Sequence, residues 1–310
     1  MNTATLNSQR FWAYLELMRP ANIVTSWADI LAGFAVSGFL VLMNQEIGGQ
    51  ATLDGLGQLA WLLIATTGLY GGGVVFNDVF DAELDTQERP ERPIPSGRAS
   101  LGGATLLGIL LLGIGVVAAA QVSWLSATLA PIVALAALFY DAFGKHHPIF
   151  GPLNMGICRG GNLLLGISAT PTMVREHWFL ALIPIIYIAA ITTISRGEVH
   201  GGKGNAGIIS LLLIGIVIAG LFGLGLLKDY ETIAALPFIV LLALRVLRPF
   251  LKAVRQPTPE QIRMAVKAGV LSLIVLDATI AAGFANLPFG LLVLSLLPVS
   301  MALARMFAVT

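Results

Sequence analysis

Residues 207–227 read GIISLLLIGIVIAGLFGLGLL, a stretch without a single charged side chain. A helix needs roughly 20 consecutive apolar residues to cross the hydrocarbon core of a bilayer. Comparable runs recur along the chain, and about ten of them would use about 200 of its residues. The stretch therefore predicts a membrane-spanning helix. Its repetition predicts an all-α, polytopic membrane bundle that forms a single integral-membrane domain over residues 1–310.

The composition supports this fold class. Hydrophobic residues make up 56% of the chain, which carries only 18 basic and 17 acidic side chains. A soluble domain of this size would carry about twice that charge. Cys158 is the sole cysteine and lies in an apolar run, so no intramolecular disulfide is expected. The net charge is +1, and we expect a lipid bilayer and small molecules as partners, and no nucleic acid.

Nine or ten spans fit the sequence, because Asn286-Leu287-Pro288 is either a tight turn or a kink in one long helix. We favour ten. The first apolar run begins after Arg19-Pro20 and lacks a small-residue cleavage site, as expected of a retained helix. The predicted spans are 21–42, 56–79, 101–122, 124–141, 152–169, 178–195, 207–227, 232–250, 264–285 and 288–308.

Basic side chains gather in alternate connectors between these spans, whereas the opposite connectors carry only Arg175 and Lys228. Connectors rich in Lys and Arg are retained in the cytoplasm. The N-terminus and the second, fourth, sixth and eighth connectors are therefore predicted to be cytoplasmic, in a multi-pass protein of the cell inner membrane.

An acidic motif ends the second predicted span. Asn77, Asp78, Asp81 and Asp85 fall within one arc of about 100° on a helix, and Glu83 points the other way. Carboxylates confined to one face repel one another, and a bound divalent ion relieves that repulsion. A ligand set made of oxygens favours magnesium over zinc. The alternative is a helix end whose acids only solubilise the following loop.

The loop that follows reads ERPERPIPSGR over residues 88–98. Its three prolines stiffen a segment that carries three arginines. Guanidinium groups grip phosphate oxygens in pairs, which suits a phosphate next to a magnesium site. The retention of basic loops in the cytoplasm would explain the arginines without a ligand, but it does not explain the prolines.

These two motifs together resemble the first signature of the UbiA family of intramembrane prenyltransferases. The resemblance covers roughly residues 15 to 210. It includes Arg19-Pro20-Ala21-Asn22 with Asp29 and Gly33 in the first span, then Tyr140 with Lys145, and Asn154, Arg159-Gly160 and Gly166 further on. It implies a helical bundle around a central cavity, in which magnesium and basic residues hold a prenyl diphosphate. The implied activity is Mg²⁺-dependent transfer of a prenyl group to a small-molecule acceptor.

Site residues follow from this resemblance and from the charges described above. The expected catalytic residues are Asp81, Asp85 and Lys145. The expected diphosphate-binding residues are Arg92, Arg98, Arg159, Lys203 and Asn22. The expected metal ligands are Asn77, Asp78, Asp81, Asp85 and Glu198.

The sixth connector departs from the family pattern, which usually has a second aspartate-rich motif there. Glu198 is its only acid, and five glycines in residues 196–207 favour a loop whose amides could cradle an anion. Arg196, Lys203 and His200 would then act as phosphate donors in place of a second metal centre. The run resembles the EboC-like branch of the superfamily. Equally, a site that lacks most of one ligand set could be unable to ionise its substrate.

Ionisable residues also occur within the predicted spans. Asn22 and Asp29 share one helical stripe in the first span, Arg159 lies in the fifth and Asp277 in the ninth. Such groups are costly at membrane depth unless they are paired or hydrated, so each is expected to face the bundle interior. For Arg159 two interpretations stay open, a diphosphate contact and a buried pair with Asp141 or Asp29.

Two functions fit the sequence. The first is the prenyltransferase. The alternative is a degenerate member of the family that binds or translocates an isoprenoid or aromatic metabolite without chemistry. The first acidic motif favours the enzyme, and the loss of the second favours the carrier.

Overall fold

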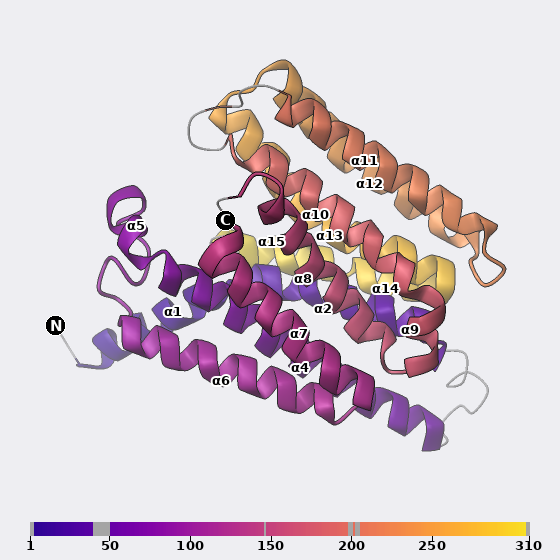
Figure 1. The fold of residues 1–310 in the computed structure, drawn as a ribbon, viewed down its shortest axis with the longest axis horizontal. Coiled ribbons are helices and arrows are strands. Elements are labelled where there is room, and N and C mark those ends of the chain that lie inside the picture. Colours follow the sequence, from indigo (N-terminus) through magenta and orange to yellow (C-terminus); the bar gives the residue numbers. More distant parts are fainter. Residues whose placement is uncertain (1–2, 40–49, 146, 198–200, 202–204, 308–310) are drawn as a thin grey trace.

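The computed structural model describes residues 3–39, 50–145, 147–197, 201 and 205–307. These residues form helices joined by short loops (Figure 1). The helices are α1 (Thr3–Met18), α2 (Pro20–Val36), α4 (Gln50–Phe80), α5 (Ala82–Glu88), α6 (Leu101–Ala120), α7 (Trp124–Phe139), η1 (Tyr140–Gly144), α8 (Phe150–Ile167), α9 (Pro171–His177), η2 (Trp178–Ala181), α10 (Leu182–Ser195), α11 (Ala206–Gly223), η3 (Leu224–Leu226), α12 (Thr232–Arg255), α13 (Pro259–Phe284), α14 (Leu287–Leu294) and α15 (Leu296–Met306).

The predicted all-α membrane bundle is confirmed. Within the described residues, eight helical segments are long and apolar enough to cross a membrane. α2 and α8 correspond to two further predicted spans, and both are rich in buried residues. Asn286 separates α13 from α14 with extended backbone and caps α14 by accepting a hydrogen bond from Phe289 N. The region around Pro288 is therefore a turn between two helices, as the ten-span alternative requires.

α13 lies at the centre of the bundle. In its most apolar window 78% of residues are buried, whereas the other seven candidate spans have between 22% and 50% buried. α2 packs against α13 on one side and against α8 on another. At the crossing of α2 and α8, a Cβ added to Gly33 would lie 2.3 Å from the carbonyl oxygen of Leu163. Small residues allow helix backbones to approach this closely in membranes.

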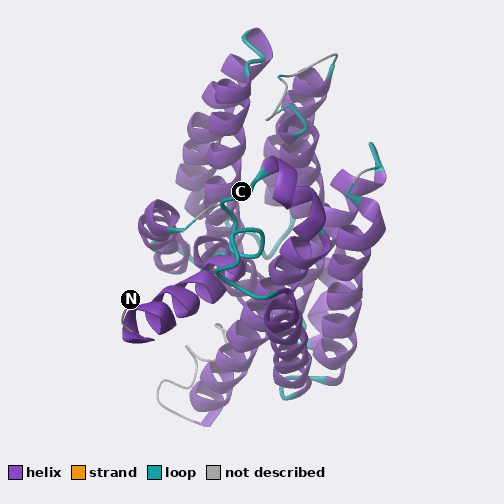
Figure 2. Cartoon of the chain, turned by 90° about the vertical axis from the view of Figure 1, so that its left-hand side faces the viewer, coloured by secondary structure: helices purple, strands orange, loops and turns teal. Residues whose placement is uncertain are grey.

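Several of the connectors predicted to be cytoplasmic lie close together. The α5 loop, the connection between η1 and α8, and the α12–α13 turn lie at one end, together with the start of α2 (Figure 1). Seen from a second direction, the long helices run side by side from one end to the other (Figure 2). The arginine-rich loop and the Tyr140–Gly144 turn therefore share one side of the membrane.

Candidate active site

The acidic motif spans the junction between α4 and α5. Asp81 sits between the two helices with φ −90° and ψ 0°, yet its amide still bonds to Asn77 O at 3.0 Å, and Asp85 N bonds to Asp81 O at 2.8 Å. Helical spacing is therefore kept through the break. Asp78 and Asp85 are buried, at 5% and 4% exposure, whereas Glu83 is exposed. This matches the one-sided arrangement that helix geometry predicted.

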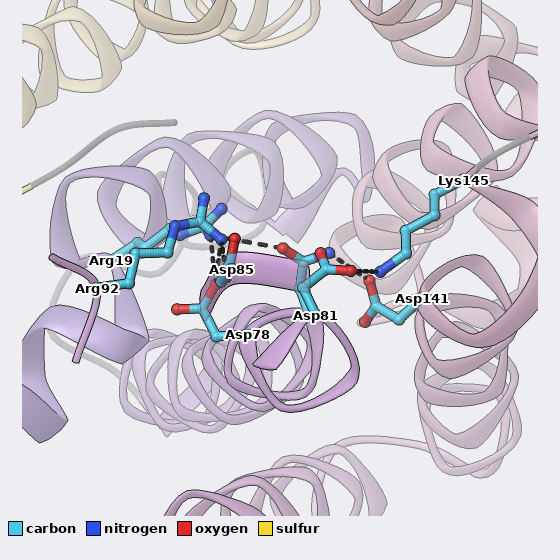
Figure 3. A network of polar contacts seen from close by, with 8 residues as sticks. Arg19, Asp78, Asp81, Asp85, Arg92, Asp141 and Lys145 are labelled. Carbon is cyan, nitrogen blue, oxygen red and sulfur yellow. Dashed lines mark hydrogen bonds and ion pairs between the residues drawn. The ribbon is translucent and has the colours of Figure 1, made fainter. Parts of the chain in front are cut away.

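Two arginines bind the buried carboxylates. Arg92 Nη1 lies 2.7 Å from Asp85 Oδ2 and 3.3 Å from Asp78 Oδ1. Arg19 Nη2 donates to the same Asp78 oxygen at 2.8 Å. Both guanidinium groups approach the acids from one side (Figure 3). The carboxylates of Asp78 and Asp85 thus both contact the guanidinium group of Arg92.

A second set of contacts lies beside the first. Lys145 donates to Asp81, and Asn77 Nδ2 donates to Asp141 Oδ1 at 2.9 Å (Figure 3). Asp81, Glu83, Asp141 and Lys145 line a cavity of about 400 Å³, together with Phe80. The two sets of contacts bring four carboxylates and three cations together at this end of the bundle.

A π-helical turn carries Asp141 and leads into Lys145. It covers Tyr140–Gly144, and Lys145 N bonds to Tyr140 O at 2.9 Å, five residues back. Such turns are rare and often occur at functional sites. The turn buries Asp141 while Lys145 stays only partly covered. It explains how Asp141 and Lys145, which both lie at the end of an apolar helix, reach residues of the acidic motif.

Arg19 reaches Asp78 from a strained backbone. It is the sole non-glycine residue with positive φ in the described part of the chain, at φ 50°, and it precedes Pro20 at the start of α2. A left-handed conformation costs such a residue on the order of 1–3 kcal/mol and persists where the surroundings impose it. The ion pair with Asp78 and the helix start at Pro20 supply that constraint.

Arg159 forms an ion pair inside the bundle. Its Nε lies 2.7 Å from Asp29 Oδ2 inside the bundle, and its Nη2 donates to Thr25 O at 2.6 Å. Of the two interpretations left open, the described contacts are those of the buried pair with Asp29. Asp141, the other candidate partner, accepts from Asn77 instead. The sequence could not separate these alternatives, because the partners are brought together only by helix packing.

Arg98 and Asn22 make other contacts. Arg98 Nη1 bonds to Glu16 on α1 at 2.7 Å, and its Nη2 bonds to Glu91 O at 2.8 Å, so it ties its own loop to the N-terminal helix. Asn22 is buried on α2 near the hydroxyl group of Tyr70, and its backbone N–H donates to Arg19 O at 2.9 Å. Both were expected to bind diphosphate, and that role stays a prediction.

Three predictions fall on the sixth connector. Glu198, His200 and Lys203 lie outside the described residues. Next to them, Arg196 Nη2 donates to His147 O at 2.6 Å, which joins the sixth connector to the fourth. Gly197 and Gly201 are not helical, as the glycine content predicted.

Two residues of the site were missed by the sequence interpretation. Asp141 was considered only as a partner for Arg159, and Arg19 only as part of a family motif. The signal for Asp141 was weak, because it is a single acid at the end of an apolar run and its partner Asn77 is 64 positions away.

The donor chemistry fits magnesium. The described residues contain no cluster of three or more acidic, His or Cys side chains around one point. Magnesium, however, is usually held by one or two carboxylates together with substrate phosphates. Asp78 and Asp85 offer two such carboxylates, and the Arg92 nitrogen between them marks a position that accepts a cation.

An all-helical membrane bundle with acids and arginines gathered at one end is the architecture of an integral-membrane prenyltransferase. Residues 38–266 match the UbiA prenyltransferase family. The chain belongs to that family, which confirms the resemblance seen in the sequence.

Two curated relatives are named digeranylgeranylglyceryl phosphate synthase. The one from Methanothrix thermoacetophila is 30% identical over 251 residues, which cover 73% of this chain and 86% of the relative. The one from Ignicoccus hospitalis is 30% identical over 201 residues, covering 64% and 61% of the two chains.

Solved structures support the fold. A structure of digeranylgeranylglyceryl phosphate synthase in membranes aligns with a TM-score of 0.64 at 22% identity, covering 89% of this chain and 98% of the other. A UbiA homologue from Aeropyrum pernix aligns with a TM-score of 0.62 at 20% identity, covering 82% and 96%.

Proposed function

We propose that this chain transfers a prenyl group from a prenyl diphosphate to a small-molecule acceptor in a magnesium-dependent reaction. The observation that carries the proposal is the convergence of Asp78 and Asp85 on one cation, with Lys145 and a cavity of about 400 Å³ beside them. A site of this kind combines hard oxygen ligands with fixed cations at the mouth of an apolar bundle.

The reaction places two demands on the protein. The bond between C1 of the prenyl chain and the diphosphate oxygen breaks, and the electron pair leaves with the diphosphate, while an acceptor atom forms the new bond to C1 and loses a proton. Positive charge must therefore stabilise the leaving group, and water must be kept from the allylic cation. The cations of this site meet the first demand, and the apolar helices around it meet the second.

Asp78 and Asp85 would hold the metal, with Asn77 and Asp81 close by. Bound magnesium would supply Lewis-acid stabilisation of the diphosphate charge. Arg92 and Arg19 lie against these acids, so they are in place to exchange carboxylate oxygens for phosphate oxygens. Lys145 would bind the same diphosphate from the opposite side of Asp81. Glu198 and Lys203 stay as predicted contributors from the sixth connector.

Arg98 and Arg159 take other roles in this proposal, and Asn22 stays a predicted diphosphate contact. Arg98 fixes the arginine-rich loop to Glu16, and Arg159 balances charge within the bundle. The relatives named digeranylgeranylglyceryl phosphate synthase make prenylated glyceryl phosphates the first acceptors to test. The expected location, an inner membrane with the site facing the cytoplasm, follows from the basic connectors.

The test is release of diphosphate from labelled geranylgeranyl diphosphate by the purified protein, with magnesium and with a chelator. We expect release that needs both magnesium and an acceptor, and none after Asp85→Asn. Glu88→Gln is the matched control, because Glu88 is exposed on the same short helix and does not line the cavity. A protein that binds the labelled substrate but releases no diphosphate with any acceptor would be a carrier, and the proposal would be wrong.

A further inference from the structure

A second cluster of charges lies inside the bundle, away from the candidate active site. Asp29 on α2, Arg159 on α8 and Asp277 on α13 meet where these three helices pack together. Asp29 and Asp277 are 0% exposed, and Arg159 is 5% exposed. The proposed reaction uses none of them.

Asp29 has partners on one of its oxygens. Its Oδ2 forms an ion pair with Arg159 Nε at 2.7 Å and accepts a hydrogen bond from Asn162 Nδ2 at 2.8 Å. Asn162 also accepts from Thr66 at 2.7 Å, which connects the cluster to α4. Oδ1 of Asp29 has no hydrogen-bond donor.

Asp277 has no donor on either oxygen. The charged groups that act on its carboxyl group are the Asp29 carboxyl group and the Arg159 guanidinium. Two ionised carboxylates are both acceptors and cannot bond to each other, whereas a protonated carboxyl group has one O–H to donate. The contact between Asp29 and Asp277 is a hydrogen bond only if a proton lies in it.

The charge balance leads to the same result. Two ionised carboxylates and one guanidinium would leave a net negative charge among buried side chains. Buried charges that are not paired cost several kcal/mol each, and a carboxyl group in such a place takes up a proton instead. One added proton makes the cluster of Asp29, Asp277 and Arg159 neutral.

Other ionisable groups near the cluster are occupied elsewhere. Arg245 on α12 donates to Ser272 Oγ at 3.3 Å, and Tyr187 on α10 donates its hydroxyl proton to Gly269 O at 2.9 Å. Tyr70 on α4 lies with its ring 5.6 Å from the Arg159 guanidinium carbon. None of these contacts supplies Asp277 with a donor.

We propose that Asp29 and Asp277 form a proton-binding site that holds one proton between their carboxyl groups at neutral pH. This proton joins α2 to α13, and Arg159 joins both to α8. The guanidinium is thereby committed to the bundle interior, which explains why it does not reach the acidic motif at the end of α4. The site does not depend on the proposed reaction.

Infrared spectroscopy of the protein in detergent or lipid tests the proposal directly. A carbonyl stretch of a protonated carboxylic acid should be present at neutral pH, shift in D₂O, and disappear in both Asp29→Asn and Asp277→Asn. Glu260→Gln, an exposed position on the same helix as Asp277, should leave the band unchanged. A wild-type spectrum without this band, or a band that survives Asp277→Asn, would overturn the proposal.

Thermal unfolding gives an independent measurement. The folded state binds the proton more tightly than the unfolded state, so wild-type stability should fall as pH rises from neutral to alkaline. Asp277→Asn keeps a donor for Asp29 without a charge, so it should fold and lack this part of the pH dependence. An identical pH dependence in the two proteins would contradict the proposal. A stabilisation by sodium over choline at alkaline pH, absent in Asp277→Asn, would instead identify a metal cation in the site and overturn the proton assignment.

Discussion

The substitution Asp85→Asn separates two effects of a single carboxylate. In the structure Asp85 Oδ2 holds Arg92 at 2.7 Å, and the same carboxylate is a proposed magnesium ligand. A hydrogen bond to a charged group contributes about 1.5–3 kcal/mol, which corresponds to about a tenfold change in affinity or more. Without magnesium, the substitution frees Arg92 and removes a negative charge next to the diphosphate. With magnesium, it removes a ligand.

We expect Asp85→Asn to raise the affinity for a prenyl diphosphate without magnesium and to lower it with magnesium. A non-hydrolysable prenyl diphosphate analogue should bind Asp85→Asn about tenfold more tightly than wild type in the presence of a chelator, and at least about tenfold more weakly in saturating magnesium. Calorimetry across a magnesium titration measures both limits. Asn is close in size to Asp, so the fold should be kept.

Glu88→Gln is the control, because it removes one negative charge from the same short helix at an exposed position that does not line the cavity. It should change affinity little in either condition. Equal shifts for Asp85→Asn and Glu88→Gln would refute a specific role for Asp85. A loss of affinity for Asp85→Asn of the same size with and without magnesium would refute its role as a metal ligand.

Three further predictions follow from the site and the packing. Lys145→Gln should weaken binding of the same analogue several-fold and leave the unfolding midpoint nearly unchanged. Lys252→Gln, at an exposed position, should change neither the affinity nor the midpoint. Equal affinities for both variants would exclude Lys145 from the site. In a Cys158→Ser background, cysteines at Thr86 and Asn205 should react with an impermeant reagent from the cytoplasmic side, and one at Gln121 from the opposite side; labelling of Thr86 and Asn205 from different sides would overturn the topology. Gly33→Ala should destabilise the protein by roughly 1–3 kcal/mol through overpacking, while Gly113→Ala, which has open space around it, should be nearly neutral; similar unfolding midpoints for the two would contradict the close crossing of α2 and α8.

The sequence predicted most of the fold, because apolar runs and charged connectors are local features that the bilayer selects directly. It also placed Asp78 and Asp85 on one buried face and Glu83 on the other, since helical spacing extends through the break at Asp81. The partners of charged residues were harder to predict. Arg98 pairs with Glu16, 82 positions away, and Arg159 pairs with Asp29 on another helix. Tertiary packing determines these pairs, and residue spacing along one helix does not predict them.

The same limit explains the missed residues. Asp141 is positioned by a π-helical turn, and a five-residue segment of this kind leaves no clear pattern in the sequence. Arg19 reaches Asp78 because its backbone adopts positive φ before Pro20, a conformation that the sequence disfavours locally.

The pairing of α2 with α8 has a consequence for how the protein is made. Asp29 and Arg159 would each cost about 2.5–3.5 kcal/mol at the centre of an isolated membrane helix. Asp29 and its partner Asn162 on α8 are 133 residues apart. During synthesis α2 therefore emerges long before the helix that neutralises it, and before α13, which completes the junction. We expect α2 to wait at the insertion machinery or at the membrane surface until α8 arrives, so that the two helices of this ion pair enter the bilayer together and the bundle closes around them last.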